Sequence, residues 1–188
     1  MPLTKLDAIT ALVLIDLQQG IVGMQMAHPA VQIVGRAARL AQAFRKKSLP
    51  VVLVNVSGLA PGRSEAARPD LAAFPAGWTE LVPELGRQSS DHIVTKQRVG
   101  AFLGTDLDAY LRQRAVTQIV LAGIATSSGV ESTARSAHDL GYNVTLAVDA
   151  MTDRSDEMHR HSVEKFFPRI GETGPTNEVL RLLNERRT

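Results

Sequence analysis

Short apolar runs rich in Val, Ile and Leu alternate along the chain with segments of helical periodicity, and this alternation constrains the fold most. Each run is nearly continuous and ends at a polar residue or a glycine. Such runs are typical of strands in a parallel sheet that helices cover on both faces. Strands are therefore predicted for 9–15, 51–56, 92–95, 118–122 and 143–148, with a last short strand within 169–173.

The segments between these runs carry apolar side chains at steps of three and four residues, as amphipathic helices do. Strand–helix alternation with right-handed crossovers indicates the α/β class, as a three-layer α/β/α sandwich around a Rossmann-like, doubly wound parallel sheet. Helices are predicted to cover 30–47, to begin at Thr105, and to cover 130–140, 156–167 and 176–186.

The chain of 188 residues is expected to form one domain over 1–188, because no linker or internal repeat interrupts it. One long stretch, 57–78, lacks the pattern of a strand or helix and is rich in Pro, Gly, Ala and Arg. It exceeds the usual loop length, which favours a functional flap or an interface arm.

Composition excludes several classes of protein. The formal net charge is only +2, too small to indicate a nucleic-acid partner. No apolar run is long enough for a signal peptide or a bilayer span, so a cytoplasmic protein without a membrane partner is expected. Cysteine is absent, which excludes disulfides, thiolate metal sites and a cysteine nucleophile. The histidines lack metal-ligand spacing, so neither a metal nor another cofactor is predicted.

Ligands of open α/β sheets bind beyond the carboxyl ends of the strands, so the residues that follow each predicted strand are the candidates for a site. A carboxylate beside an ammonium group can move protons and stabilise charge. The polar residues expected to share this crevice are Asp16 with Gln18, Asn55 with Ser57, Lys96 with Arg98, the turn 123–129, and Asp149.

Each of these candidates also has a structural explanation. Asp16 could cap the next turn, and an isolated lysine such as Lys96 more often points to solvent. Ser128 and Glu131 have the spacing of a capping box, and this role outweighs that of a nucleophile because the G-x-S-x-G elbow is absent. The turn 123–129 matches neither common phosphate-binding glycine motif. The residues alone therefore predict a crevice without a named reaction.

Four blocks of the sequence, taken in order, resemble the isochorismatase-like hydrolases, a superfamily that also holds nicotinamidases and N-carbamoyl amidohydrolases. The blocks are 11–18 (ALVLIDLQ), 96–107 (KQRVGAFLGTDL), 121–134 (LAGIATSSGVESTA) and 141–150. The resemblance extends from about Ile9 to Leu183. It implies a six-stranded parallel sheet in the order 3-2-1-4-5-6.

By this resemblance the family's catalytic acid maps to Asp16 and its lysine to Lys96, while Gly129 occupies the position of the nucleophilic cysteine. A glycine there closes the acyl-thioester route, and isochorismatases proper resemble this chain in carrying it. The implied reaction is hydrolysis of a vinyl ether to a dihydroxy acid and pyruvate. Asp16 would protonate the enol-ether carbon and water would add, with no covalent intermediate.

The resemblance further implies a small carboxylate-bearing substrate and a homo-oligomer, either a dimer or a tetramer. It implies a non-proline cis peptide bond at Ile124–Ala125, which would turn the amides of Ala125 and Gly129 toward the crevice. Substrate contacts are expected from Gln18, Arg98, Phe102, Ala125 and Ser128.

Two other functions stay open. The stretch from Ala125 to Ser128 resembles the amidase-like branch and not the Tyr-Ala-His-like stretch of siderophore-type isochorismatases. This allows an amidase that works without cysteine, through water or Ser128. The other alternative is a family member that has lost catalysis and binds a small molecule or a partner protein. The Asp/His metal motif of nicotinamidases is missing from 55–78.

Overall fold

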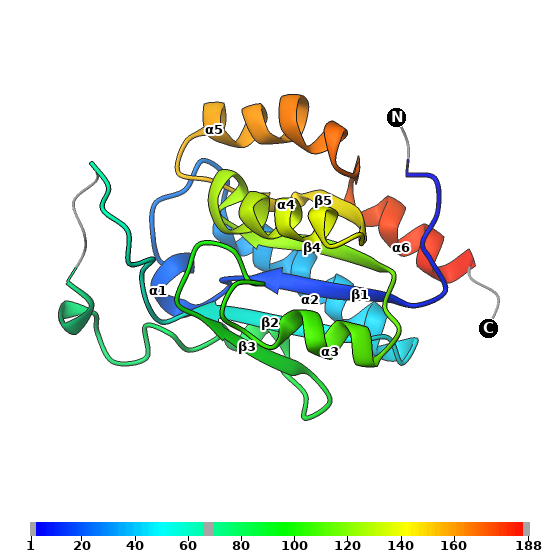
Figure 1. Cartoon of the computed structure of the whole chain (residues 1–188), viewed down its shortest axis with the longest axis horizontal. Helices are drawn as coiled ribbons and strands as arrows, with labels where there is room; N and C mark the ends of the chain where they lie inside the picture. Colours follow the sequence, from blue (N-terminus) through cyan, green and yellow to red (C-terminus); the bar gives the residue numbers. More distant parts are fainter. Residues whose placement is uncertain (1–2, 66–69, 186–188) are drawn as a thin grey trace.

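The computed structural model describes residues 3–65 and 70–185. Its centre is a six-stranded parallel sheet in the order β3-β2-β1-β4-β5-β6, with helices on both faces (Figure 1). The three-layer architecture and the strand order are therefore both confirmed. The strands are β1 Thr10–Ile15, β2 Val51–Val56, β3 His92–Lys96, β4 Gln118–Ile124, β5 Asn143–Thr152 and β6 Glu172–Gly174.

Alternate side chains of each central strand enter separate cores on the two faces of the sheet. In β1, Leu12 and Leu14 pack toward α2 and α6, whereas Val13 and Ile15 pack toward α3 and α4. Full burial of one such side chain stabilises the fold by about 1.5–3 kcal/mol. The helices are α1 Gln19–Val22, α2 Ala30–Lys46, α3 Leu107–Gln113, α4 Glu131–Asp139, α5 Asp156–His161 and α6 Thr176–Glu185.

Two predicted helices differ from the structure in extent. The helix expected from Thr105 begins at Leu107, where the Thr105 hydroxyl accepts the Leu107 N–H at 3.3 Å. The helix expected over 156–167 is α-helical only in α5 and continues as a π-helical turn over Ser162–Phe166.

Strand β5 is longer than predicted, and this changes which residues reach the edge of the sheet. The strand continues to Thr152 because its pairing with β4 shifts register between Leu121 and Gly123. Asp149 therefore lies within the strand, where its Oδ1 accepts hydrogen bonds from the N–H and hydroxyl of Thr176 at 2.6 and 2.7 Å. The expectation that Asp149 faces the crevice is wrong, because its carboxylate holds the start of α6.

The described parts of the long stretch, 57–65 and 70–78, extend away from the sheet beyond the carboxyl ends of the strands (Figure 1). Its regular structure among the described residues is one short 3-10 turn, Leu71–Ala73. Trp78 stacks on Phe74 with ring centroids 4.3 Å apart. Part of this stretch, 66–69, lies outside the described residues. A role as flap or as interface arm in a homo-oligomer stays a prediction.

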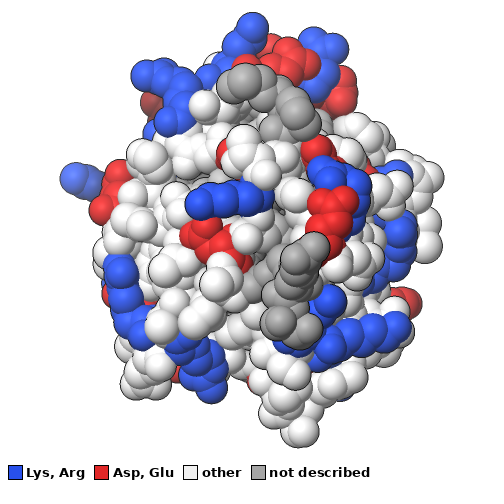
Figure 2. Space-filling model, turned by 90° about the vertical axis from the view of Figure 1, so that its right-hand side faces the viewer, with Lys and Arg blue, Asp and Glu red and all other residues white. Residues whose placement is uncertain are grey.

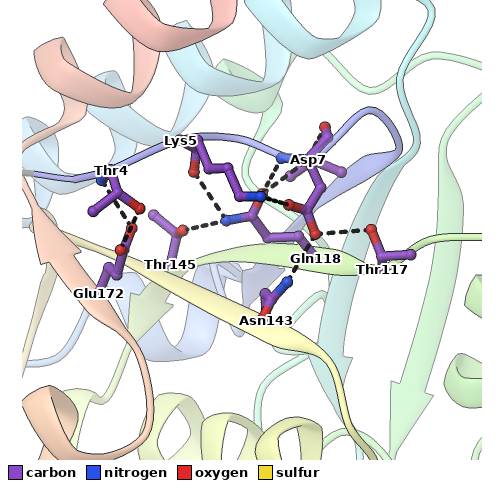
Figure 3. A network of polar contacts seen from close by, with 9 residues as sticks. Thr4, Lys5, Asp7, Thr117, Gln118, Asn143, Thr145 and Glu172 are labelled. Carbon is purple, nitrogen blue, oxygen red and sulfur yellow. Dashed lines mark hydrogen bonds and ion pairs between the residues drawn. The ribbon is translucent and has the colours of Figure 1, made fainter.

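The amino ends of the strands carry a dense polar network, which fastens the N-terminal segment to β4 and β5 (Figure 3). The Asp7 carboxylate accepts hydrogen bonds from Thr117 at 2.9 Å and from Asn143 at 2.8 Å. The buried Gln118 amide accepts from the Asp7 N–H at 2.6 Å and donates to Thr145 at 3.0 Å.

Figure 2 shows the face of the molecule that lies at the right-hand side of Figure 1, where both chain ends are found. Basic and acidic side chains are interspersed on this face. Among the helices that the structure describes, none combines the length and apolar character needed to cross a bilayer.

Candidate active site

The site lies at the carboxyl-end edge of the sheet, where the strand order reverses between β1 and β4. Ile15 pairs with Gly123 at the end of these two strands. Asp16 follows directly with a φ of +52°, and its N–H donates to the Val54 carbonyl of β2 at 2.9 Å. This left-handed conformation is uncommon for a residue with a side chain.

Asp16 forms a buried ion pair with Lys96, the last residue of β3. The Asp16 Oδ2 and Lys96 Nζ atoms are 2.7 Å apart, and the two side chains are only 8% and 3% exposed. The ammonium group also donates to the Arg98 carbonyl at 3.2 Å. The structural explanations considered from the sequence, a capping role for Asp16 and a solvent-exposed Lys96, are therefore wrong. The two side chains form an ion pair that is buried away from water.

Burial raises the pKa of Asp16 to about 6, although the charge of Lys96 and its hydrogen bond partly oppose this effect. The second carboxylate oxygen, Oδ1, is buried and has no hydrogen-bond partner among the residues described. Asp16 is thus a buried carboxyl group that can hold or release a proton near neutral pH.

The turn that faces Asp16 begins at Gly123, which has a φ of +124°. A Cβ atom here would lie 2.1 Å from the Ile15 carbonyl oxygen, so the close approach of β1 and β4 requires glycine. The following peptide bond, Ile124–Ala125, is cis, which confirms the prediction.

A π-helical turn over Thr126–Val130 connects this peptide to α4. The turn has no side-chain cap, and Ser128 is exposed. The predicted capping box is wrong, because helical structure begins before Ser128 and the Glu131 carboxylate instead accepts hydrogen bonds from Arg135 and Ser162. Ser127 is fixed differently, since its N–H donates to the Asp153 carboxylate at 2.7 Å.

Gly129 faces the Asp16 carboxylate. A Cβ atom at this position would lie 3.3 Å from Asp16 Oδ2 and 2.9 Å from the Cγ2 methyl of Ile15. Glycine therefore leaves space next to the carboxylate, and a side chain would require Ile15 to move.

These residues line an open cavity of about 610 Å³, a volume in the range of small-molecule sites. Of the residues predicted from the sequence, the cavity brings together Asp16, Lys96, Arg98, Ala125, Ser128 and Gly129.

Two other predicted substrate-binding residues lie outside this lining. The buried Gln18 amide donates to the carbonyls of Val56 and Trp78, both at 3.1 Å, and accepts the Val56 N–H at 2.7 Å. It joins the end of β2 to the long loop. Phe102 packs near Tyr142, with ring centroids 5.9 Å apart.

Sequence reasoning missed several residues of the cavity. Asp153 and Arg154 follow the true end of β5, and the apolar pair Ala150–Met151 after Asp149 was the signal that the strand continues. Ser127 was missed because Ser128 has the spacing of a cap. The cavity also has an apolar part, to which Ile21, Met24, Met26, Leu59 and Met158 contribute.

The cavity holds three basic side chains and two acidic ones. Lys96 pairs with Asp16, whereas the guanidinium groups of Arg98 and Arg154 pair with no carboxylate of residues 3–65 and 70–185. In this same part of the chain, no three His, Cys, Asp or Glu side chains are grouped to hold a metal ion.

Comparison with known proteins identifies the family. The isochorismatase domain matches residues 10–178. An uncharacterized isochorismatase family protein of Bacillus subtilis, YwoC, is 46% identical over 177 residues, which are 91% of this chain and 92% of that protein. The ureidoacrylate amidohydrolase RutB of Variovorax paradoxus is 37% identical over 109 residues, 54% of this chain and 43% of RutB.

Among solved structures, an isochorismatase family protein from Burkholderia thailandensis superposes with a TM-score of 0.91 at 38% identity. The match covers 97% of this chain and 99% of that one. Family match, close relatives and fold agree over nearly the whole chain. The chain therefore belongs to the isochorismatase family of hydrolases.

Proposed function

We propose that this hydrolase cleaves a small carboxylate-bearing vinyl ether, of the isochorismate type, without a covalent intermediate. The observation that carries the proposal is the buried Asp16 carboxyl group, 2.7 Å from Lys96, opposite the position of Gly129. A general acid works best when its pKa lies near the working pH, and the pKa of Asp16 is raised to about 6.

In this mechanism, protonated Asp16 transfers its proton to the terminal carbon of the enol ether. The adjacent carbon becomes an oxocarbenium ion, whose positive charge faces the newly formed Asp16 carboxylate. Water then adds to the cationic carbon and returns one proton to Asp16. The hemiketal that results breaks its carbon–oxygen bond and gives an alcohol and a keto acid.

Lys96 has two roles in the proposal. Its positive charge lowers the pKa of Asp16, which would otherwise be raised further by burial. It also keeps the carboxylate in one orientation by the 2.7 Å contact. Arg98 and Arg154 would attract the substrate carboxylate, since neither is neutralised by a described acidic side chain.

We also propose that Gly129 takes the place of the cysteine nucleophile of other family members. The space beside Asp16 Oδ2 that a Cβ would occupy supports this assignment. The substrate carbon can then approach the carboxyl group directly, as carbon protonation requires.

An amidase that uses water as the nucleophile is the second candidate. The 37% identity to an amidohydrolase over 109 residues favours it. Ser128 is a poor nucleophile for such a reaction because, among the described residues, no histidine lines the cavity to act as its base.

Turnover of two panels of compounds separates the candidates. Isochorismate and simpler vinyl ethers of pyruvate form one panel, and ureido and N-carbamoyl acids form the other. We expect hydrolysis in the first panel only, and a loss of about 10³-fold or more in kcat for Asp16→Asn. Asp139→Asn, an exposed change on α4, is the matched control and should act like the wild type. Hydrolysis of amides alone, or an active Asp16→Asn variant, would overturn the proposal.

A further inference from the structure

The geometry points to Ser127 as a specificity-determining residue, whose hydroxyl group binds a hydroxyl or carboxylate oxygen of the substrate. This inference rests on the proposed function, since it places the substrate in the Asp16 cavity. The sequence indicates the turn 123–129 as part of the crevice but does not single out Ser127, because its neighbour Ser128 has the more familiar helix-start pattern.

The first observation is that the Ser127 hydroxyl lacks a partner. Its Oγ atom is buried, and no group in the described part of the chain forms a hydrogen bond with it. Buried polar atoms in folded proteins nearly always have a partner, and Ser127 lines the cavity, so the missing partner is assigned to a ligand atom.

The local backbone explains why the hydroxyl has no internal partner. Serine and threonine in regular helices bond back to the carbonyl four residues earlier. Two residues further along do this: Thr133 donates to Gly129 at 2.6 Å, and Ser136 donates to Ser132 at 3.1 Å. Ser127 lies in the π-helical turn, and the residue four positions earlier, Gly123, belongs to strand β4.

The second observation is that the backbone of Ser127 is held firmly. Its N–H donates to one oxygen of the buried Asp153 carboxylate at 2.7 Å, and the Arg154 N–H donates to the other at 2.7 Å. Asp153 thus ties the turn after β4 to the end of β5. A hydroxyl fixed in this way is preorganised, so binding needs little further ordering.

The third observation is that the cavity contains a second unpartnered buried oxygen, Asp16 Oδ1. A hydroxyl group both donates and accepts hydrogen bonds, and a carboxyl group accepts them when ionised. A substrate that carries hydroxyl or carboxylate oxygens can satisfy both groups, whereas a purely apolar one leaves both unpaired. Ser127 therefore selects against substrates that lack such an oxygen.

Thermal melting of the ligand-free protein tests the inference without a substrate. Ser127→Ala removes a hydroxyl that has no partner, so the Tm should stay the same or rise by about 2–4 °C. The matched control is Thr133→Val, which removes a buried hydroxyl with two partners, the Gly129 carbonyl and the Ala101 N–H. Its Tm should fall by a similar amount. A fall in Tm for Ser127→Ala would assign the hydroxyl a structural partner and overturn the inference.

Kinetics on the vinyl ether panel supply the second test. For a hydroxylated substrate such as isochorismate, Ser127→Ala should lower kcat/KM by about 10-fold, chiefly through KM. Ser127→Thr keeps the hydroxyl and should recover part of the loss, and Ser136→Ala should have no effect. An unchanged kcat/KM in Ser127→Ala would overturn the inference. If the wild type hydrolyses no vinyl ether, the proposed function fails, and the melting comparison alone decides the role of Ser127.

Discussion

A polar network at the amino ends of the strands contrasts with two buried polar atoms at their carboxyl ends. At the amino ends, the side chains of Asp7 and Gln118 make several hydrogen bonds each within the protein (Figure 3). At the carboxyl ends, Asp16 Oδ1 and Ser127 Oγ are buried without a partner among the described residues. Satisfied polar groups stabilise and specify a fold, whereas unsatisfied ones keep binding capacity for a ligand.

This contrast predicts that changes to the unpaired polar groups at the carboxyl ends reduce activity and that changes to the paired polar groups at the amino ends reduce stability. The largest expected effect is the pH dependence of the rate that Asp16, the proposed general acid, confers. If Asp16 acts when protonated, kcat/KM should be level well below pH 6 and fall about tenfold per pH unit above it. The pH–rate profile measures this, and a rate that rises through pH 6 would make Asp16 a base.

Lys96→Met should change both the rate and the profile. Without the ammonium group the pKa of Asp16 rises further, so the descending limb should move to higher pH. The maximal rate should fall about 100-fold or more, because charge stabilisation in the cavity is lost. Lys165→Met, an exposed change, serves as control. A limb that moves to lower pH would contradict the part assigned to Lys96.

Gly123→Ala should be the most damaging change for stability. The new methyl group would lie 2.1 Å from the Ile15 carbonyl, a backbone atom that cannot turn away. We expect a loss of more than about 4 kcal/mol, or failure to fold. Gly141→Ala is the matched control, since its φ is +86° but no atom lies within 4 Å of the added Cβ. For this variant the free energy of unfolding, measured in urea, should fall by only about 1 kcal/mol. Equal losses would show that backbone conformation alone, and not the β1–β4 contact, requires glycine.

Gln118→Leu tests the amino-end network. The change removes four hydrogen bonds, to Lys5, Asp7, Thr10 and Thr145, and leaves buried groups unpaired. Stability should fall by about 2–4 kcal/mol in urea unfolding, while the activity of the folded protein is unchanged. Gln113→Leu on the surface of α3 should shift stability by no more than about 0.5 kcal/mol. If Gln118→Leu lost activity without losing stability, the polar groups at the amino ends and at the carboxyl ends of the strands would not differ in role.

Much of the fold and the centre of the site could be predicted from the sequence. Apolar runs set the strands, and the residue after a buried run, such as Asp16 or Lys96, is carried to the same edge in any parallel sheet. The strand order and the cis peptide came from family resemblance, and the structure agrees with both.

The site residues that the sequence did not reveal depend on where a strand ends or which residue of a turn faces the cavity. Hydrophobic periodicity does not determine these positions to within one or a few residues. Asp149 interrupts an apolar run, but β5 tolerates it because Thr176 satisfies the carboxylate from a helix far along the chain. Ser127 and Ser128 are neighbours in the same π-helical turn, but only Ser127 is held by the Asp153 carboxylate, and Ser128 is exposed. That turn contacts α5, which lies about thirty residues further along the chain, and no local pattern contains such a contact.

The Ile15 methyl group beside Gly129 also bears on how such a site can evolve. It lies 2.9 Å from where a Cβ atom would be, so the Cβ of a cysteine at this position would press on the last residue of β1. A change to cysteine therefore requires the Ile15 side chain to shift, in addition to any change in chemistry. Packing next to the carboxylate therefore opposes a side chain at position 129, whichever reaction the cavity carries out.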